Sequence, residues 1–257
     1  MANQPKERSV HFTIVTDKPD FYSWLGERVT IVSIDEHRIA EWKGQHQFFW
    51  RVKIEAILEA SKQHSGHTIY LDTDTVCFNN LEAMMSCLDQ GSNLMHLKEF
   101  DFAKTQGGTG KKMKSHGLNK QYGEFVLSES SAMWNAGVVA ISEKNNAETT
   151  LNNALNACDA MCADNMERKL IEQFSLSLAL QANTMTEGKT WFKHYWGNKE
   201  QWNEVIADLL AKSLLLNWNL EQAVKEFTTI DLSIPEVIKE TKLAKYKNSI
   251  KKRLPKL

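Results

Sequence analysis

The sequence predicts an α/β fold in which a mostly parallel sheet is flanked by helices on both faces. Short runs of β-branched and apolar residues alternate with amphipathic helical stretches over the first 90 residues. Two of these runs end at aspartates, Asp17 and Asp72. Strands that alternate with helices usually form parallel sheets, and ligands bind at the carboxyl ends of their strands. The 42% hydrophobic and 25% charged composition is that of a globular protein rather than a disordered or fibrous one.

The first part of the chain contains the clearest alternation. Strands are predicted at 10–16, 28–34 and 67–71, and helices at 48–63 and 81–88. Glycine, proline and aspartate clusters separate these segments, as they do between regular elements.

The pattern is interrupted between residues 90 and 131. Within it, the segment 104–117 is polar, glycine-rich and basic. We interpret this segment as a lid or acceptor-side loop, with a plain solvated loop as the alternative. Order resumes with a strand at 131–142, helices at 147–163 and 166–181, and a mainly helical remainder.

The charge is unevenly distributed along the 257 residues. The last 17 residues hold seven basic residues and no acidic ones, so the first 240 carry 24 basic and 32 acidic residues, a net charge of -8. An acidic body argues against nucleic acid as a partner. The apolar residues of the tail recur at helical spacing between its lysines, which predicts an amphipathic helix on an anionic membrane surface. A frayed terminus, or a helix docked on the acidic body, is the alternative.

Several features favour a cytoplasmic location. No apolar run reaches the roughly 18 residues that a membrane span needs, and the polar residues 1–9 do not resemble a signal peptide. The four cysteines form no metal or disulfide pattern and are expected to be free thiols. The basic tail would bring such a protein to the inner face of the membrane.

The sharpest local signal is the pair Asp72 and Asp74 directly after an apolar strand. Side chains two residues apart lie on the same side of an extended chain, where two carboxylates repel unless a cation relieves them. Mn²⁺ and Mg²⁺ take oxygen ligands and share them with substrate phosphates. His194 lies in an aromatic and basic segment and is the candidate third ligand. A solvated turn and a packed histidine are the structural alternatives.

Other polar residues are candidates for substrate contacts. Arg51, Lys53 and Lys199 could meet a phosphate, and Gly197 permits close backbone approach. The segment 135–137 opens a buried strand and could bind a sugar hydroxyl. Each of these has a structural alternative, either as a solvent-exposed position on a helix or as residues that mark the start of a strand.

Taken in order, these segments resemble a known enzyme family. They are 13–17 with Tyr22, Arg51 and Lys53, 70–74, 134–138, Glu172 with Gln173, and 194–199. The chain resembles nucleotide-sugar glycosyltransferases of the GT-A (Rossmann-like) fold. It is most similar to the retaining family 8, which includes lipopolysaccharide galactosyl- and glucosyltransferases and the glycogenins.

The resemblance implies a role for each matching position. It implies that Asp72, Asp74 and His194 hold Mn²⁺ or Mg²⁺. It implies that Thr16, Asp17 and Tyr22 contact the nucleotide, with Asp17 at the base. The diphosphate would meet Arg51, Lys53, Gly197 and Lys199, with Arg51 alternatively bracing the aspartates. Asn135, Ala136 and Gly137 would line the donor-sugar pocket, beside Glu172 and Gln173.

Two positions depart from the family pattern. The family's Asp-Gln pair begins here with Glu172, and Lys199 follows Gly197 by two residues rather than three. The second departure leaves the role of Lys199 open. If the reaction retains configuration, Gln173 near the anomeric carbon suffices; if it inverts, Glu172 is the candidate general base. Retention is the favoured reading.

The expected function is therefore metal-dependent transfer of a hexose from a nucleotide diphosphate sugar, usually a UDP-sugar in this family, to a glycan or glycolipid. A sugar nucleotidyltransferase is the first alternative, although the segment 17–22 lacks its glycine-rich signature. A non-catalytic nucleotide-sugar-binding protein is the second. The predicted domains are a catalytic domain at 1–240, with nucleotide-binding and acceptor halves meeting near residue 90, and a basic tail at 241–257.

Overall fold

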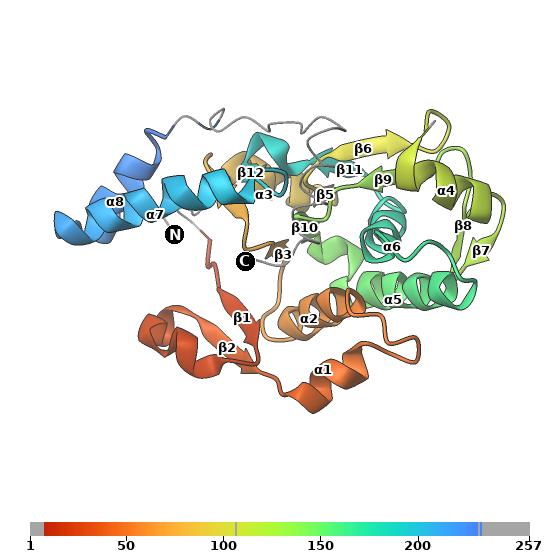
Figure 1. Ribbon diagram of the computed structural model, residues 1–257, viewed down its shortest axis with the longest axis horizontal. Helices are drawn as coiled ribbons and strands as arrows, with labels where there is room; N and C mark the ends of the chain where they lie inside the picture. The colour runs from red at the N-terminus through yellow and green to blue at the C-terminus, as the bar shows by residue number, and fades with distance from the viewer. Residues whose placement is uncertain (1–7, 106, 231, 233–257) are drawn as a thin grey trace, which may run out of the picture. The chain divides into compact units, whose positions relative to one another are not determined.

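The computed structural model shows a mixed α/β protein (Figure 1). The structure describes residues 8–105, 107–230 and 232. The chain divides into two compact units whose boundary lies between His194 and Tyr195. The predicted tail at 241–257 lies outside the described residues.

The first unit contains most of the regular structure. Its strands are β1 (Thr13–Thr16), β2 (Thr30–Ser33), β3 (Thr68–Leu71), β4 (Thr75–Cys77), β5 (Asn93–Met95), β6 (Lys98–Asp101), β7 (Gln121–Tyr122), β8 (Phe125–Val126), β9 (Ala132–Trp134), β10 (Val138–Ile141), β11 (Met185–Glu187) and β12 (Phe192–His194). Its α-helices are α1 (Glu36–Trp42), α2 (Arg51–Ser61), α3 (Glu82–Asp89), α4 (Gly108–Gly117), α5 (Ala147–Ala163) and α6 (Ile171–Leu180). Its 3₁₀ helices are η1 (Pro19–Arg28), η2 (Glu143–Asn145) and η3 (Gly188–Thr190).

The largest sheet has the strand order β11-β5-β10-β3. Strand β11 runs parallel to β5, whereas β10 runs antiparallel to both β5 and β3. Elsewhere β1 pairs with β2 in parallel, and β12–β4, β6–β9 and β7–β8 pair antiparallel. Because the central strand β10 runs opposite to both of its neighbours, β3 and β5, these pairings do not confirm a Rossmann-like, mostly parallel sheet.

The residues of strand β10 belong to two hydrophobic clusters, one on each face of the sheet. They alternate between the two clusters, as the period of two in a strand requires. Val139 and Ile141 pack with α2, α5 and α6, whereas Val138 and Ala140 pack with α3 and β5. All four residues are 0% exposed. The sheet is therefore covered by helices on both faces, as the sequence predicts for the fold.

The predicted segments of the first unit largely coincide with observed elements. Strands β1, β2 and β3 lie inside the predicted strand ranges, α2 inside 48–63, and α5 spans the predicted 147–163. Local signals account for their ends. The side chain of Asp35 caps α1 through the Arg38 amide, and the side chain of Asn146 caps α5 through the Thr149 amide.

The loop predicted at 104–117 is a helix over most of its length. Helix α4 spans Gly108–Gly117 and buries Met113. A Cβ on Gly110 would lie 2.5 Å from the ring of Phe100, so the glycine that suggests a loop in the sequence allows the helix to pack closely here. Tertiary packing thus overrides the poor helix propensity of this segment.

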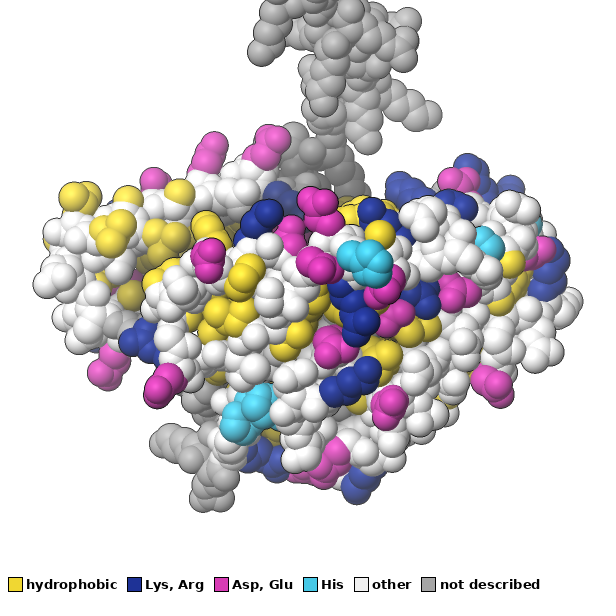
Figure 2. All heavy atoms as spheres, turned by 90° about the horizontal axis from the view of Figure 1, so that it is seen from below, with side chains coloured by type: hydrophobic (Ala, Val, Ile, Leu, Met, Phe, Trp, Pro, Cys, Tyr) yellow, Lys and Arg dark blue, Asp and Glu magenta, His cyan; other side chains and the backbone are white. Residues whose placement is uncertain are grey.

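Aromatic side chains are exposed on the first unit. Phe21 and Trp24 on η1 are each 72% exposed, and Phe49 and Trp50 before α2 are 57% and 60% exposed. Figure 2 shows one face of the molecule, on which hydrophobic side chains lie at the surface among charged ones.

The second unit is helical where it is described. Helix α7 (Lys199–Leu215) is followed by α8 (Leu220–Phe227), which begins with a capping box formed by Asn219 and Gln222. Trp202 is buried and stacks on Tyr195 at a centroid distance of 5.4 Å. In the described parts of both units, no helix is both long enough and apolar enough to cross a membrane.

Candidate functional site

Asp72, Asp74 and His194 meet at one place in the first unit. Each offers a ligand atom, and these atoms all lie within 4.8 Å of one another. The Nε2 atom of His194 is 3.3 Å from Oδ1 of Asp74 and 3.6 Å from Oδ2 of Asp72. The structure thus brings together the three residues that the sequence suggests as metal ligands.

Strand pairing explains how a residue distant in sequence reaches the aspartates. Asp72 follows β3 and Asp74 precedes β4, so both lie in the short connection between these strands. Strand β12 pairs antiparallel with β4, in a register that sets His194 opposite Thr75. The backbone amide of Asp72 also donates to the carbonyl of Gly137 at 2.9 Å, which ties the connection to the start of β10.

The ring of His194 has one consistent hydrogen-bonding arrangement. The Asn135 side-chain oxygen accepts from the Gly137 amide at 3.0 Å, so the atom facing His194 is an acceptor. It lies 2.7 Å from His194 Nδ1, which therefore carries the proton and donates. Burial lowers the pKa of His194, which favours the neutral ring. The lone pair of Nε2 then faces the two aspartates.

This donor set fits a divalent cation. Two carboxylates and an imidazole lone pair repel one another at these distances unless a positive charge lies between them. Carboxylate oxygens suit both Mn²⁺ and Mg²⁺, and the softer imidazole nitrogen favours Mn²⁺ over Mg²⁺. A histidine ligand usually donates its other N–H to an oxygen acceptor, as Nδ1 does here. The residues present therefore fit the metal that the resemblance implies.

Gly137 and His96 hold the ring of His194 in place. A Cβ on Gly137 would lie 2.1 Å from Nδ1 of His194, so only glycine leaves room for the ring. His96 packs edge-on against His194 with ring centroids 5.5 Å apart. Burial and the neighbouring His194 lower the pKa of His96 to about 4, so His96 adds no positive charge at neutral pH.

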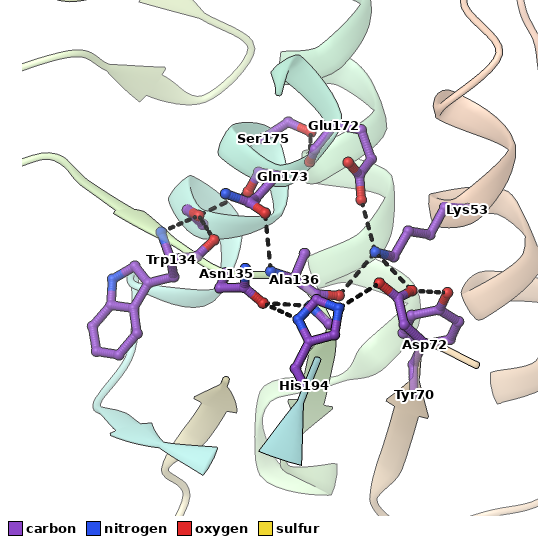
Figure 3. A network of polar contacts seen from close by, with 12 residues as sticks. Lys53, Tyr70, Asp72, Trp134, Asn135, Ala136, Glu172, Gln173, Ser175 and His194 are labelled. Atoms are coloured by element: carbon purple, nitrogen blue, oxygen red, sulfur yellow. Dashed lines mark hydrogen bonds and ion pairs between the residues drawn. The ribbon is translucent and has the colours of Figure 1, made fainter. Parts of the chain in front are cut away.

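Lys53 links Asp72 to Glu172 on the buried helix α6 (Figure 3). Its Nζ donates to the carbonyl of Ala136 at 2.8 Å and lies 3.2 Å from both Asp72 and Glu172. Tyr70 donates its hydroxyl to the same oxygen of Asp72 at 2.5 Å. One ammonium group thus braces carboxylates from two separate elements, and Asp72 is held from two sides.

Glu172 and Gln173 are both buried at the start of α6. Burial raises the pKa of Glu172, and the ammonium of Lys53 opposes that rise. The side-chain oxygen of Gln173 accepts from the Ala136 amide at 3.3 Å. Gln173 therefore contacts the segment 135–137 directly, and Glu172 is linked to it through Lys53; the sugar-pocket role of the pair stays a prediction.

Arg51 does not lie in this cluster. Its guanidinium makes two hydrogen bonds to Asp159 on α5, at 2.8 and 3.2 Å, and one to Glu55 at 2.6 Å. It also donates to the carbonyl of Trp42 at 2.8 Å. Arg51 therefore ties α2 to α5 and α1, and Lys53 occupies the bracing position that the sequence suggests for Arg51.

The predicted nucleotide contacts lie at and after the end of β1. Thr16 is buried and its hydroxyl accepts from the Lys18 amide, whereas Asp17 is exposed. Tyr22 lies on η1, where its ring meets Phe21 edge-on. Within the described residues, the hydrogen bonds, ion pairs and ring contacts of these three side chains involve only residues close to them in sequence, and their nucleotide roles stay predictions.

Gly197 and Lys199 belong to the second unit. Both are exposed, and Lys199 is the first residue of α7. Their predicted contact with a diphosphate stays a prediction.

Two contributors were missed by sequence reasoning. Glu99 accepts hydrogen bonds from Asn135 and Gln173, and Tyr70 donates to Asp72. Glu99 lies in the stretch where the sequence pattern is interrupted, and no motif marks it. Tyr70 lies two residues before Asp72, so the alternation of side chains along an extended chain could have placed the two on the same side.

Comparison with known proteins adds no family assignment. No protein-family model matches the sequence, and no curated protein matches it.

Proposed function

We propose that this protein is a metal-dependent glycosyltransferase of the GT-A type. It transfers a hexose from a nucleotide diphosphate sugar, UDP-hexose being the expected donor. The observation that carries the proposal is the convergence of Asp72, Asp74 and His194, with Lys53 and Glu172 next to them. A cation held beside a lysine and buried polar side chains is an arrangement that can stabilise a diphosphate leaving group.

The side chains have distinct tasks in this proposal. Asp72, Asp74 and His194 hold the cation, which when bound would stabilise negative charge on the leaving diphosphate. Lys53 holds Asp72 in place and adds a positive charge close by. The hydrogen-bonded network around His194 would keep these groups oriented before substrate binds, so that little reorganisation is needed during the reaction.

The sugar would lie against the segment 135–137 and the start of α6. We infer that Gln173 meets the anomeric face and that the reaction retains configuration. The Gln173 oxygen accepts from the Ala136 amide through one lone pair, and its second lone pair would stabilise positive charge on the sugar ring without taking a proton. Glu172 is committed to Lys53, which supports a role in positioning rather than as the general base of an inverting reaction.

We also infer a glycan or glycolipid acceptor and a cytoplasmic location, with the basic tail on an anionic membrane surface. The basic charge of residues 241–257, and the helical spacing of their apolar residues in the sequence, support the contact with the membrane surface. Sedimentation with phosphatidylglycerol-containing liposomes tests it. Equal sedimentation of a chain ending at Glu240 would contradict the role of the tail.

A hydrolysis screen tests the catalytic proposal. Purified protein is incubated with UDP-glucose, UDP-galactose and related nucleotide sugars, with Mn²⁺ or with EDTA, and released UDP is measured. We expect UDP release from at least one donor that depends on Mn²⁺ and falls at least about 100-fold in Asp74→Asn. Metal-independent release, or release unchanged in that variant, would contradict the proposal.

A further inference from the structure

Glu99 occupies an irregular position in strand β6. Lys98 pairs with Trp134 and Phe100 pairs with Met133, so Glu99 is the extra residue of a β-bulge. Bulges re-aim side chains and are frequent beside active sites. Here the bulge accompanies a carboxylate that reaches two amide side chains of the proposed sugar pocket.

Both oxygens of Glu99 are used. Oε1 accepts from the Asn135 side-chain amide at 3.0 Å, and Oε2 accepts from the Gln173 side-chain amide at 3.1 Å. Asn135 and Gln173 come from different elements, the β9–β10 connection and α6. An ionised carboxylate can only accept, so it selects the NH₂ end of each amide.

The opposite ends of the two amides face donors. The Asn135 oxygen accepts from the Gly137 amide and from His194 Nδ1, and the Gln173 oxygen accepts from the Ala136 amide. The network is thus satisfied in only one orientation of each amide. If Asn135 were reversed, its NH₂ group would face the Gly137 N–H and the donor hydrogen of His194.

We propose that Glu99 is a positioning residue for the metal site, which acts through Asn135 to keep the proton of His194 on Nδ1 and the lone pair of Nε2 toward the aspartates. The inference rests on the metal site of the proposed function. Glu99 is neither a predicted metal ligand nor a predicted pocket residue. It contacts Asn135, which in turn contacts the candidate ligand His194. Outer partners of this kind change metal affinity roughly 10- to 100-fold when removed.

Glu99→Gln is the most informative variant. A glutamine can accept from one amide only, and its own NH₂ group then faces the other, so one of the two amides loses its acceptor. The side chain of Glu99 is exposed, so the substitution does not leave a cavity in the core. Glu124→Gln, at an exposed acidic residue of the first unit, is the matched control for the loss of one charge.

Two measurements on the full chain test the inference. Mn²⁺ binding is measured by calorimetry, and the protonated nitrogen of His194 is identified by ¹⁵N NMR in the metal-free protein, with His194→Gln for assignment. We expect Nδ1–H in the wild type, a loss of that signal in Glu99→Gln, and a Mn²⁺ affinity about tenfold lower. Glu124→Gln should match the wild type in both.

A double variant tests whether Glu99 acts by positioning Asn135 or only through its negative charge. Asn135→Ala and Asn135→Ala/Glu99→Gln should bind Mn²⁺ equally, because Glu99 acts through Asn135. Additive losses would overturn the inference, as would wild-type affinity in Glu99→Gln or an Nδ1 without its proton in the wild type. If the wild type binds no Mn²⁺, the proposed function itself fails, whereas Mn²⁺ binding that Glu99→Gln leaves unchanged removes only the role of Glu99.

Discussion

Nδ1 of His194 lies against the side-chain oxygen of Asn135 at 2.7 Å, and this contact turns the other ring nitrogen toward Asp72 and Asp74. Three separate parts of the chain meet in this relationship. The aspartates come from the β3–β4 connection, Asn135 from the β9–β10 connection, and His194 from the end of β12.

Gly137→Ala should displace the ring of His194. The new Cβ would lie 2.1 Å from Nδ1, closer than any unstrained contact, so the ring must move. We expect Mn²⁺ affinity to fall at least about tenfold. Calorimetric titration measures this, with thermal unfolding to show that the variant is folded. Gly107→Ala is the control, because a Cβ there meets nothing within 4 Å. Unchanged affinity in a folded Gly137→Ala protein would show that the ring position does not matter.

Lys53→Met should destabilise the protein in a pH-dependent way. The variant leaves Glu172 buried without its ammonium partner, which costs about 3 kcal/mol at neutral pH. Burial raises the folded-state pKa of Glu172, so the folded state binds the proton more tightly than the unfolded state. Stability is then lost as pH rises from the unfolded pKa toward the folded one. Removing Lys53 raises the folded pKa further and extends that loss to higher pH.

Urea unfolding between pH 4 and 8 measures this effect. The double variant Lys53→Met/Glu172→Gln should recover part of the lost stability and flatten the pH dependence, because it removes the ionisable carboxyl. If the single variant shows no steeper fall with pH than the wild type, Lys53 does not compensate Glu172.

Arg51→Met should lower stability without affecting metal binding. Its guanidinium bridges α2 and α5 through Asp159, and the side chain is only 12% exposed. We expect a loss of about 2 kcal/mol, below the range for fully buried pairs because Asp159 is 31% exposed. Urea unfolding gives the stability and Mn²⁺ titration the affinity. Lys62→Met, at a surface ion pair with Glu59, should change little. A large loss of Mn²⁺ affinity at unchanged stability would instead show that Arg51 contributes to metal binding.

Local signals in the sequence were sufficient for much of the fold and for suggesting the three residues that converge, Asp72, Asp74 and His194. Strand β3 with its terminal aspartates, the strand around β10 and helix α5 all follow from local pattern. His194 was suggested by its neighbours in sequence, but its approach to Asp74 depends on the β12–β4 pairing, which no local pattern encodes. Arg51 and Lys53 are two residues apart on one helix, so the sequence could not show which faces α5 and which faces the aspartates.

Other features depend on tertiary packing. The direction of β10 between β3 and β5 is set by how the sheet assembles, not by its own apolar sequence. Helix α4 forms from a glycine-rich segment because Gly110 allows close packing on Phe100. Glu99 enters the network through a bulge, a one-residue irregularity that ordinary strand periodicity cannot reveal.

The central claim is that Asp72, Asp74 and His194 form a metal site that binds a nucleotide diphosphate. The most direct measurement is the thermal stability of the wild type and of Asp74→Asn with UDP, with Mn²⁺, and with both together. We expect UDP and Mn²⁺ together to raise the wild-type melting temperature more than the two separate shifts combined, because each ligand helps to bind the other. Asp74→Asn should lose that extra shift, and Asp208→Asn, an exposed aspartate on α7, should keep it. A wild type that shows no added shift with both ligands, or an Asp74→Asn variant that shows the full shift, would contradict the account.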